Sequence, residues 1–258
     1  MELNIDNEIF VVGGAGAGFG RAIAEELAVN GAIVLAVSRT KDKLISLREN
    51  HPQKIDYLVG DITLDATHDE IVKWIGTRKL SGLVFNGGGP PAGKIEEVNM
   101  DMWDEAWRNI VRWKINLTYK ILPLLKLQEY GRFLFIESVS VKEPVANLVL
   151  SNSLRPAIVG FAKTMSQEIA NFGITVNILA PGYHNTAAME RLFVKKAETD
   201  NITIEEAKHE MERDIPVGKM GEPYEMASLA CWLLSPLSRY VTGQTITHDG
   251  GMVRSIFG

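Results

Sequence analysis

The stretch Val11–Arg21, which reads VVGGAGAGFGR, follows a short apolar run and leads into a segment with helical periodicity, Phe19–Val29. Glycines let a backbone turn sharply and approach a bound group closely, and the N-terminus of a helix presents N–H groups to an anion. The stretch therefore predicts a phosphate-binding turn between a strand and a helix. The strict G-x-G-x-x-G spacing of one class of such turns is absent.

The rest of the chain repeats this order of elements, because short apolar runs alternate with longer helical patterns and no linker or repeat divides them. Several of the runs are apolar throughout, which is typical of parallel strands covered on both faces. The pattern predicts an α/β fold: one domain over residues 1–258 with a doubly wound parallel sheet (Rossmann fold) of about seven strands and helices on both faces. Strands are expected at Ile9–Val12, Ala32–Val37, Ile55–Val59, Gly82–Phe85, Arg132–Glu137, Thr175–Leu179 and Gln244–Thr247, and helices include Asp101–Leu127 and Asn152–Asn171.

Composition narrows the classes of function. The 258 residues carry a formal net charge of -5 with no basic stripe, so a nucleic acid partner is not expected. The apolar runs are too short to cross a bilayer, and the segment Met1–Asn4 does not resemble the start of a signal peptide. We therefore expect a cytoplasmic protein without membrane contacts. The only cysteine, Cys231, lies in an apolar stretch and is expected in the core, without a disulfide or a cysteine metal site.

The glycine-rich turn resembles the T-G-x-x-x-G-x-G turn of the short-chain dehydrogenase/reductase family, with Gly13 where that family usually has threonine. Further matches to the family follow in the correct order along nearly the whole chain, which makes the resemblance specific. The overall pattern is similar to that of the 3-oxoacyl carrier-protein reductases. The matching segments are Gly14, Gly18 and Gly20, Asp61-Ile62, Asn86-Gly87-Gly88, Pro181-Gly182 with Thr186, Gly218–Pro223, Thr242-Gly243 and Asp249–Gly251.

The resemblance implies a nicotinamide dinucleotide as cofactor. The choice between its two forms depends on the residues after the second strand, where an acidic side chain favours NAD(H) and arginine pairs with the 2′-phosphate of NADP(H). Because these residues are Ser38 and Arg39, NADP(H) is favoured and NAD(H) is the alternative. In a second interpretation, Arg39 is a solvated residue beside Thr40, a candidate helix N-cap. The implied cofactor contacts are Gly14, Gly18, Phe19, Gly20, Arg39, Asp61, Ile62, Asn86, Gly87, Pro181, Gly182 and Thr186.

The catalytic half departs from the family pattern of a serine, a tyrosine and a lysine four residues after that tyrosine. Ser138 matches the serine and is expected to hydrogen-bond a substrate carbonyl, but Ser151 and Arg155 occupy the tyrosine and lysine positions. An alkyl hydroxyl is a poor acid, so Ser151 is limited to relaying a proton or binding substrate. Arg155 stays protonated and is expected near the nicotinamide ribose or at a developing oxyanion. Alternatively, Ser151 caps a helix that begins there, with Pro156 in its first turn.

The family also has an asparagine on the preceding long helix. Counting without gaps places that position at Ile110, which fits an apolar stripe, whereas an offset of one residue would restore Asn109. Asn116 lies further along the same helix. Other groups that could donate the proton are Tyr183 and His184 after Pro181-Gly182, and Glu137 and Lys142 beside Ser138.

These features predict an NADP(H)-dependent oxidoreductase acting on a small carbonyl or alcohol. The alternative is a nucleotide-binding protein that has lost turnover, such as a cofactor sensor or an inactive partner subunit. The polar segment 187–217 is expected to form a lid over the substrate. The resemblance also implies a homo-oligomer, a dimer or a homotetramer, and exposed aromatic side chains on the long helix would serve its interface: Trp103, Trp107, Trp113 and Tyr119.

Overall fold

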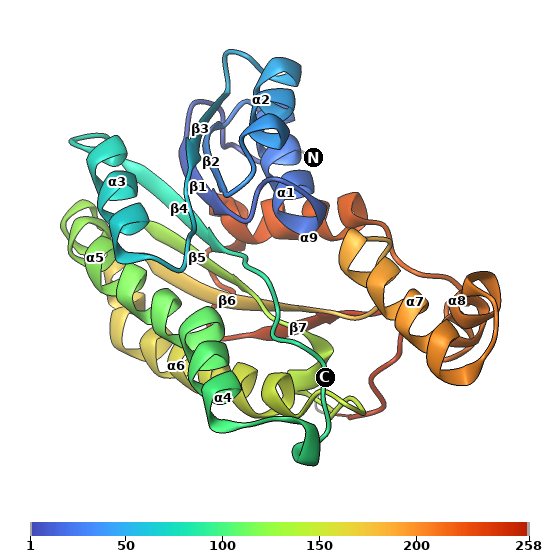
Figure 1. The fold of residues 1–258 in the computed structure, drawn as a ribbon. Helices are drawn as coiled ribbons and strands as arrows, with labels where there is room; N and C mark the ends of the chain where they lie inside the picture. The colour runs from blue at the N-terminus through green and yellow to red at the C-terminus, as the bar shows by residue number, and fades with distance from the viewer. Residues whose placement is uncertain (1, 257–258) are drawn as a thin grey trace.

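The computed structural model describes residues 2–256 and contains one seven-stranded parallel sheet with the strand order β3-β2-β1-β4-β5-β6-β7 (Figure 1). The predicted doubly wound sheet is confirmed, and the ends of each predicted strand differ from the observed ones by no more than two residues. The strands are β1 (Ile9–Gly13), β2 (Ile33–Ser38), β3 (Ile55–Val59), β4 (Leu80–Phe85), β5 (Gly131–Ile136), β6 (Ile174–Pro181) and β7 (Thr245–His248).

Helices cover both faces of the sheet, as apolar strands without alternation require. One core lies between the sheet and α3, α4, α5 and α6, and a second lies between the sheet and α1, α2 and α9, where Cys231 is fully buried as expected (Figure 1). The α-helices are α1 (Gly18–Val29), α2 (Lys41–Asn50), α3 (Asp65–Ile75), α4 (Met100–Trp107), α5 (Trp113–Gln128), α6 (Val149–Ile169), α7 (Ala187–Asp200), α8 (Ile204–Arg213) and α9 (Pro223–Leu234).

Strand β1 pairs in parallel with β2 on one side and with β4 on the other. The chain therefore winds outward from β1 in both directions, toward β2 and β3 on one side and toward β4 and β5 on the other. The loops after β1 and β4 diverge and form a crevice at the carboxyl edge of the sheet. Ligands of open parallel sheets bind in such a crevice. The glycine-rich turn after β1 and Asn86 after β4 both lie at this edge.

The long helix predicted at Asp101–Leu127 is interrupted, which corrects that prediction. Between α4 and α5 lies a π-helical segment, Arg108–Arg112, in which the wider turn shifts the usual backbone hydrogen bonds. The Trp113 indole N–H donates to the Asn109 carbonyl oxygen at 2.9 Å. Trp113 is buried against Phe85, so its predicted place on an exposed interface is wrong, whereas Trp107 and Tyr119 are exposed.

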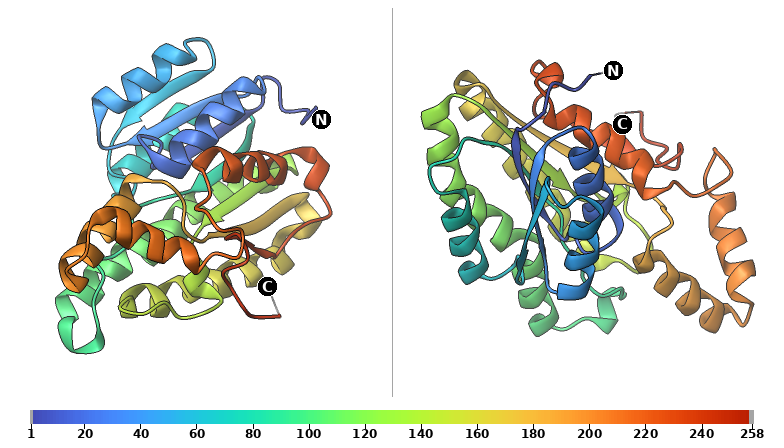
Figure 2. Two further views of the ribbon diagram at one scale, coloured as in Figure 1. Left: turned by 90° about the vertical axis from the view of Figure 1, so that its right-hand side faces the viewer. Right: turned by 90° about the horizontal axis from the view of Figure 1, so that it is seen from above.

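Helices α7 and α8 stand away from the rest of the fold and project beyond the end of the sheet, as Figure 1 and the right-hand view in Figure 2 show. They span most of the segment 187–217. A small apolar cluster fixes their base to the loop before α9 through Met189, Phe193, Ile215 and Met220.

Phe85 is the residue on which we expect the first core to depend most. Its ring stacks on Phe135 with centroids 4.2 Å apart and also contacts Phe133 and Trp113. Phe85→Ala should lower the free energy of unfolding by about 3 to 5 kcal/mol, because the cavity is enclosed by rigid rings. Urea denaturation measures this change. Tyr240→Ala, at a 96% exposed residue, is the control and should change stability by less than about 0.5 kcal/mol. A similar loss in both variants would contradict this account of the core.

Candidate active site

The glycine-rich turn packs directly against the loop after β4. Asn86 donates from Nδ2 to the Gly13 carbonyl oxygen at 3.2 Å, and a Cβ on Gly14 would lie 2.6 Å from that same nitrogen. Gly14 also has φ of 60°, which disfavours any other residue. No side chain caps the N-terminus of α1, so its first amides remain available to an anion. This arrangement fits the pyrophosphate of a dinucleotide.

The turn also meets the loop after β6. A Cβ on Gly18 would lie 3.6 Å from the Thr186 Cγ2 atom, and the Phe19 ring contacts His184 edge-on with centroids 5.0 Å apart. The structure thus brings together two segments, Gly18–Gly20 and Pro181–Thr186, that lie far apart in the sequence. Both belong to the predicted cofactor site.

Arg39 follows β2 and lies on the same side of the crevice as Asp61, with 3.8 Å between its Nη1 atom and the Asp61 Oδ2 atom. Its side chain is 79% exposed, so the guanidinium is accessible to a ligand. Thr40 begins α2 without a side-chain capping bond. Lys43, which the sequence analysis did not single out, lies near Ser38, since the Cβ atoms of Ser38 and Lys43 are 3.2 and 3.7 Å from where a Cβ on Gly16 would lie. Arg39 and Lys43 are therefore both close to the end of β2, where the 2′-phosphate is expected.

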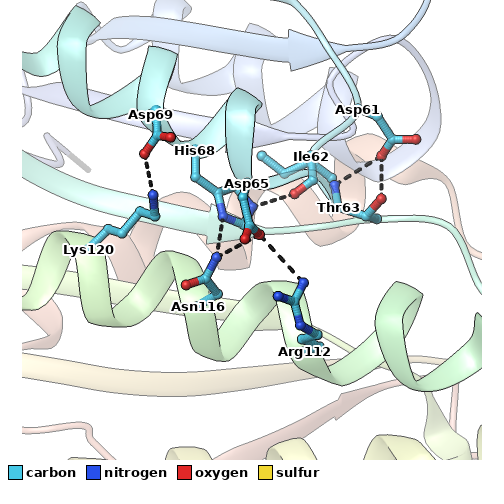
Figure 3. A network of polar contacts seen from close by, with 9 residues as sticks. All are labelled: Asp61, Ile62, Thr63, Asp65, His68, Asp69, Arg112, Asn116 and Lys120. Carbon is cyan, nitrogen blue, oxygen red and sulfur yellow. Dashed lines mark hydrogen bonds and ion pairs between the residues drawn. The ribbon is translucent and has the colours of Figure 1, made fainter. Parts of the chain in front are cut away.

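The loop with Asp61 and Ile62 is fixed by a polar network, shown in Figure 3. Asp61 accepts hydrogen bonds from the backbone N–H and the hydroxyl of Thr63, at 2.9 and 2.8 Å. His68 on α3 is fully buried, and its Nε2 atom lies 2.7 Å from the Ile62 carbonyl oxygen. Asn116 on α5 donates to Asp65 at 2.8 Å and lies 3.3 Å from His68 Nδ1. Asn116 thus supports the cofactor half, and it does not reach Ser138 or Ser151.

These contacts assign a neutral tautomer to His68. A hydrogen on Nε2 is needed to donate to Ile62, and Nδ1 must then accept from the Asn116 amide. Burial is the main cause that lowers the pKa of His68, although the Ile62 carbonyl opposes the shift. The residue therefore holds the loop in place as a neutral imidazole.

At the end of β5, the half-buried Ser138 begins a short 3₁₀ turn, Val139–Val141, and its hydroxyl accepts from the Ser140 N–H at 3.3 Å. The hydroxyl proton remains available to a substrate oxygen. Ser140 is buried, and its hydroxyl oxygen lies 3.1 Å from that of Ser151. Ser140, just beyond the end of β5, therefore borders the position where the family has its tyrosine.

Ser151 does not cap a helix, which corrects the alternative interpretation. Helix α6 begins at Val149, two residues before Ser151, and Pro156 lies well inside it. The Ser151 hydroxyl instead accepts from Arg155 Nε at 3.0 Å. The Arg155 side chain is only 11% exposed, so it is not a solvated surface residue.

Arg155 belongs to a buried cluster of three charged side chains. Its Nη1 atom donates to Glu137 Oε2 at 2.9 Å, and the other oxygen of Glu137 pairs with Lys114 on α5. The side chains of Lys114 and Glu137 are 3% and 0% exposed. Burial lowers the pKa of Lys114, Glu137 raises it in part, and Arg155 lowers it further. Sequence analysis missed Lys114, although a lysine within an apolar helical stripe was a signal that a buried acid faces it.

The family asparagine has no counterpart at the predicted positions. Ile110 is buried in the first core, as its apolar stripe indicated. Asn109 is partly buried and its amide lies 3.4 Å from Glu105, so the offset that would restore it brings no asparagine into the site. Within the described chain, Lys114 is the long-helix residue that reaches the Ser151 and Arg155 cluster.

The structure weakens the case for Tyr183 and His184 as proton donors. His184 Nδ1 lies 3.1 Å from the Gly182 carbonyl oxygen and Nε2 lies 2.8 Å from His248 Nδ1, so both ring nitrogens have protein partners. Burial is the main cause that lowers the pKa of His184. Tyr183 packs against the apolar base of α7 and α8, and burial raises the pKa of its phenol.

The crevice, the glycine-rich turn and the Ser138 region together define an α/β oxidoreductase that uses a nicotinamide dinucleotide. Residues 14–253 match a family of short-chain dehydrogenases described as Enoyl-(Acyl carrier protein) reductase. The chain therefore belongs to the short-chain dehydrogenase/reductase family, as its sequence motifs indicated, and the expectation of an NAD(P)-dependent oxidoreductase is confirmed.

Two relatives illustrate the range of this similarity. The NADPH-dependent reductase BacG of Bacillus subtilis (strain 168) is 29% identical over 250 residues, which cover 94% of this chain and 96% of BacG. The 3-oxoacyl-[acyl-carrier-protein] reductase FabG of Thermotoga maritima is 28% identical over 256 residues, covering 97% of this chain and all of FabG (100%). The crystal structure of YwfH, an NADPH-dependent reductase involved in bacilysin biosynthesis, superposes with a TM-score of 0.92 at 28% identity, covering 97% of this chain and 100% of YwfH.

The neutral state of His68 predicts a loss of stability in acid. The unfolded chain takes up a proton near the ordinary histidine pKa of 6.5, whereas the folded chain does so only at lower pH. The stabilisation is therefore complete above about pH 6.5 and is lost as the pH falls toward the lowered pKa, by at most about 1.4 kcal/mol per pH unit for one group. Urea denaturation from pH 5 to 8 measures it.

His68→Gln should flatten part of this pH dependence, with the remainder due to His184, whose pKa is also lowered. His209→Gln, at a histidine 80% exposed in its side chain, is the matched control. An unchanged slope in the His68 variant would show that His68 is not held neutral.

Proposed function

We propose that this protein is an NADPH-dependent reductase that acts on the carbonyl group of a small molecule, or on the alcohol in reverse. The observation that carries the proposal is the crevice in which the glycine-rich turn, with an uncapped helix N-terminus, lies near an exposed Arg39 at the 2′-phosphate position. The reductase BacG (YwfH), to which the chain is similar in sequence and in structure, is named for its use of NADPH.

Each candidate residue has a separate role in this proposal. Ser138 donates a hydrogen bond from its hydroxyl to the substrate oxygen, and Arg155 supplies fixed positive charge beside the reacting centre. Solvent supplies the proton that completes the alcohol. Ser151 orients Arg155 through the hydrogen bond to Nε and connects it to Ser140. The bound dinucleotide supplies the hydride. The proposed dinucleotide site consists of Gly14, Gly18, Phe19, Gly20, Asp61, Ile62, Asn86, Gly87, Pro181, Gly182 and Thr186.

Three further features belong to the same proposal. The whole chain acts as one domain, and α7 and α8 cover the substrate, because their base adjoins Tyr183 and the loop that meets the glycine-rich turn. The chain assembles as a dimer or tetramer through the exposed aromatic residues Trp107 and Tyr119.

Because NADPH must be regenerated, we place the reductase in the cytoplasm. No helix among residues 2–256 is both long and apolar enough to span a membrane.

Arg39→Ala tests the choice of cofactor. Loss of a guanidinium pair with a phosphate should raise the Kd for NADPH by about tenfold or more, because a charge-assisted hydrogen bond contributes about 1.5 to 3 kcal/mol. The Kd for NADH should change little. Nucleotide fluorescence measures both constants, with Arg239→Ala as a surface control. Equal losses for NADPH and NADH would contradict the assignment of Arg39.

Turnover separates the reductase from a protein that only binds the nucleotide. We expect oxidation of NADPH at 340 nm with a panel of aldehydes, ketones and 3-oxoacyl thioesters. Ser138→Ala should reduce kcat by about 10²-fold with little change in the Kd for NADPH, as is typical for removal of a donor to the reacting oxygen. Tight NADPH binding with no hydride transfer to any of these compounds would instead favour the alternative of an inactive binding protein.

The oligomer is tested by sedimentation of the whole chain. We expect a mass of two or four times 28.5 kDa. The double variant Trp107→Lys and Tyr119→Lys should shift the distribution toward the monomer, because two buried cations at one interface are costly to desolvate. A monomeric wild-type protein at micromolar concentration would contradict this part of the proposal.

A further inference from the structure

The cluster around Glu137 holds more positive than negative charge. Lys114 and Arg155 are cations, and the ion pairs of both end on the single carboxylate of Glu137. Among residues 2–256, no other acidic side chain lies within ion-pair distance of either cation. With Lys114 and Arg155 both protonated, the cluster has a net charge of plus one in a region where its three side chains are almost wholly buried.

An unbalanced buried cation is costly, because the protein interior does not replace the solvation that water gives. The same causes act on Lys114: burial lowers its pKa, and repulsion from Arg155 lowers it further despite the contact with Glu137. An anion that enters the cluster would offset this cost. Ser140 and Ser151 are hydroxyl groups and cannot balance the charge.

The geometry leaves one nitrogen of Arg155 without a hydrogen-bond partner among residues 2–256. Arg155 uses Nε on Ser151 and Nη1 on Glu137, whereas Nη2 has no hydrogen-bond partner among the described residues. That nitrogen faces the loop after β4, since a Cβ on Gly89 would lie only 3.2 Å from it. The absence of a side chain at Gly89 lets this loop pass close to the guanidinium, at the carboxyl edge of the sheet where ligands of such folds bind.

We propose that the substrate is an anionic carbonyl compound, and that its carboxylate binds to the open Nη2 side of Arg155 while Lys114 and Glu137 set the charge and orientation of that group. The proposal rests on the reductase function above and specifies its substrate class. Arg155 is the binding residue, and Lys114 and Glu137 are positioning residues that act through it.

The cofactor does not account for this charge. Its phosphates are expected at the N-terminus of α1 and beside Arg39, and its nicotinamide ribose carries only hydroxyl groups. A guanidinium matches a carboxylate in shape and charge better than it matches a hydroxyl. Ser138 remains available for the carbonyl oxygen, so one substrate can use both groups.

The test compares straight-chain 2-oxo acids of three to eight carbons with the corresponding 2-oxo amides, which differ only in the charged group. We expect kcat/KM for the best acid to exceed that of its amide by about 10²-fold, in line with a charge-assisted contact in a buried site. Titration calorimetry of the protein with NADP⁺ bound should also show binding of the acid and little binding of the amide.

Lys114→Met isolates the role of the net charge, because it leaves Arg155 paired with Glu137 and makes the cluster neutral. It should raise KM for the acid by about tenfold and leave KM for the amide nearly unchanged. Lys73→Met removes the same charge from an exposed position on α3 and should change neither constant. Arg155→Lys should lose most of the preference for the acid, since an ammonium cannot donate to Ser151, Glu137 and the substrate in the same geometry. The Kd for NADPH, measured by fluorescence, verifies that each variant is folded.

The results also separate this inference from the proposed function. If the acid binds the NADP⁺ complex but no compound is reduced, the carboxylate site stands and the reductase function fails. If neutral carbonyls are reduced as well as their acids, or if Lys114→Met weakens the acid and the amide equally, the carboxylate site is wrong while the reductase function stands.

Discussion

The parallel pairing of β1 with both β2 and β4 determines where chemistry can occur in this fold. Each strand must continue through a connection that leaves the sheet at its carboxyl edge, and the connections separate at β1. Asn86 and the glycine-rich turn then approach so closely that a side chain at Gly14 would overlap the Asn86 amide. The space needed by a dinucleotide is therefore made by main-chain geometry, before any charged residue contributes.

The two halves of the site are stabilised by different physics. In the cofactor half, a buried neutral histidine and the Asn116 amide hold the Asp61 loop through hydrogen bonds, and the charged groups that face the crevice remain exposed. In the catalytic half, the charges themselves are buried and depend on one carboxylate, Glu137. Burial restricts the motion of Arg155 and raises the strength of its field, because little water remains to screen it.

The sequence predicted the sheet, its strands and the cofactor turn because those features depend on local patterns: apolar runs, glycines and their spacing. It also singled out Ser138, Ser151 and Arg155 as candidate site residues, but it did not determine what they contact. Residue spacing could not predict the interruption of the long helix at Arg108–Arg112, because a π turn depends on the packing around Trp113. Two signals for the buried cluster were present: Lys114 lies on the same helical stripe as Ile121 and Leu125, and Glu137 follows an apolar strand.

The π-helical segment has a consequence for how this site could have arisen. Adding or removing one residue in a helix rotates everything beyond it by about 100° relative to what comes before. Lys114 lies two residues after the end of this segment and points toward Glu137, whereas Asn116, two residues later, points toward α3. A single-residue deletion in Arg108–Arg112 would turn a different side of α5 toward Arg155. A change in chain length, with no new charged residue, would thus be enough to exchange one set of polar partners for another.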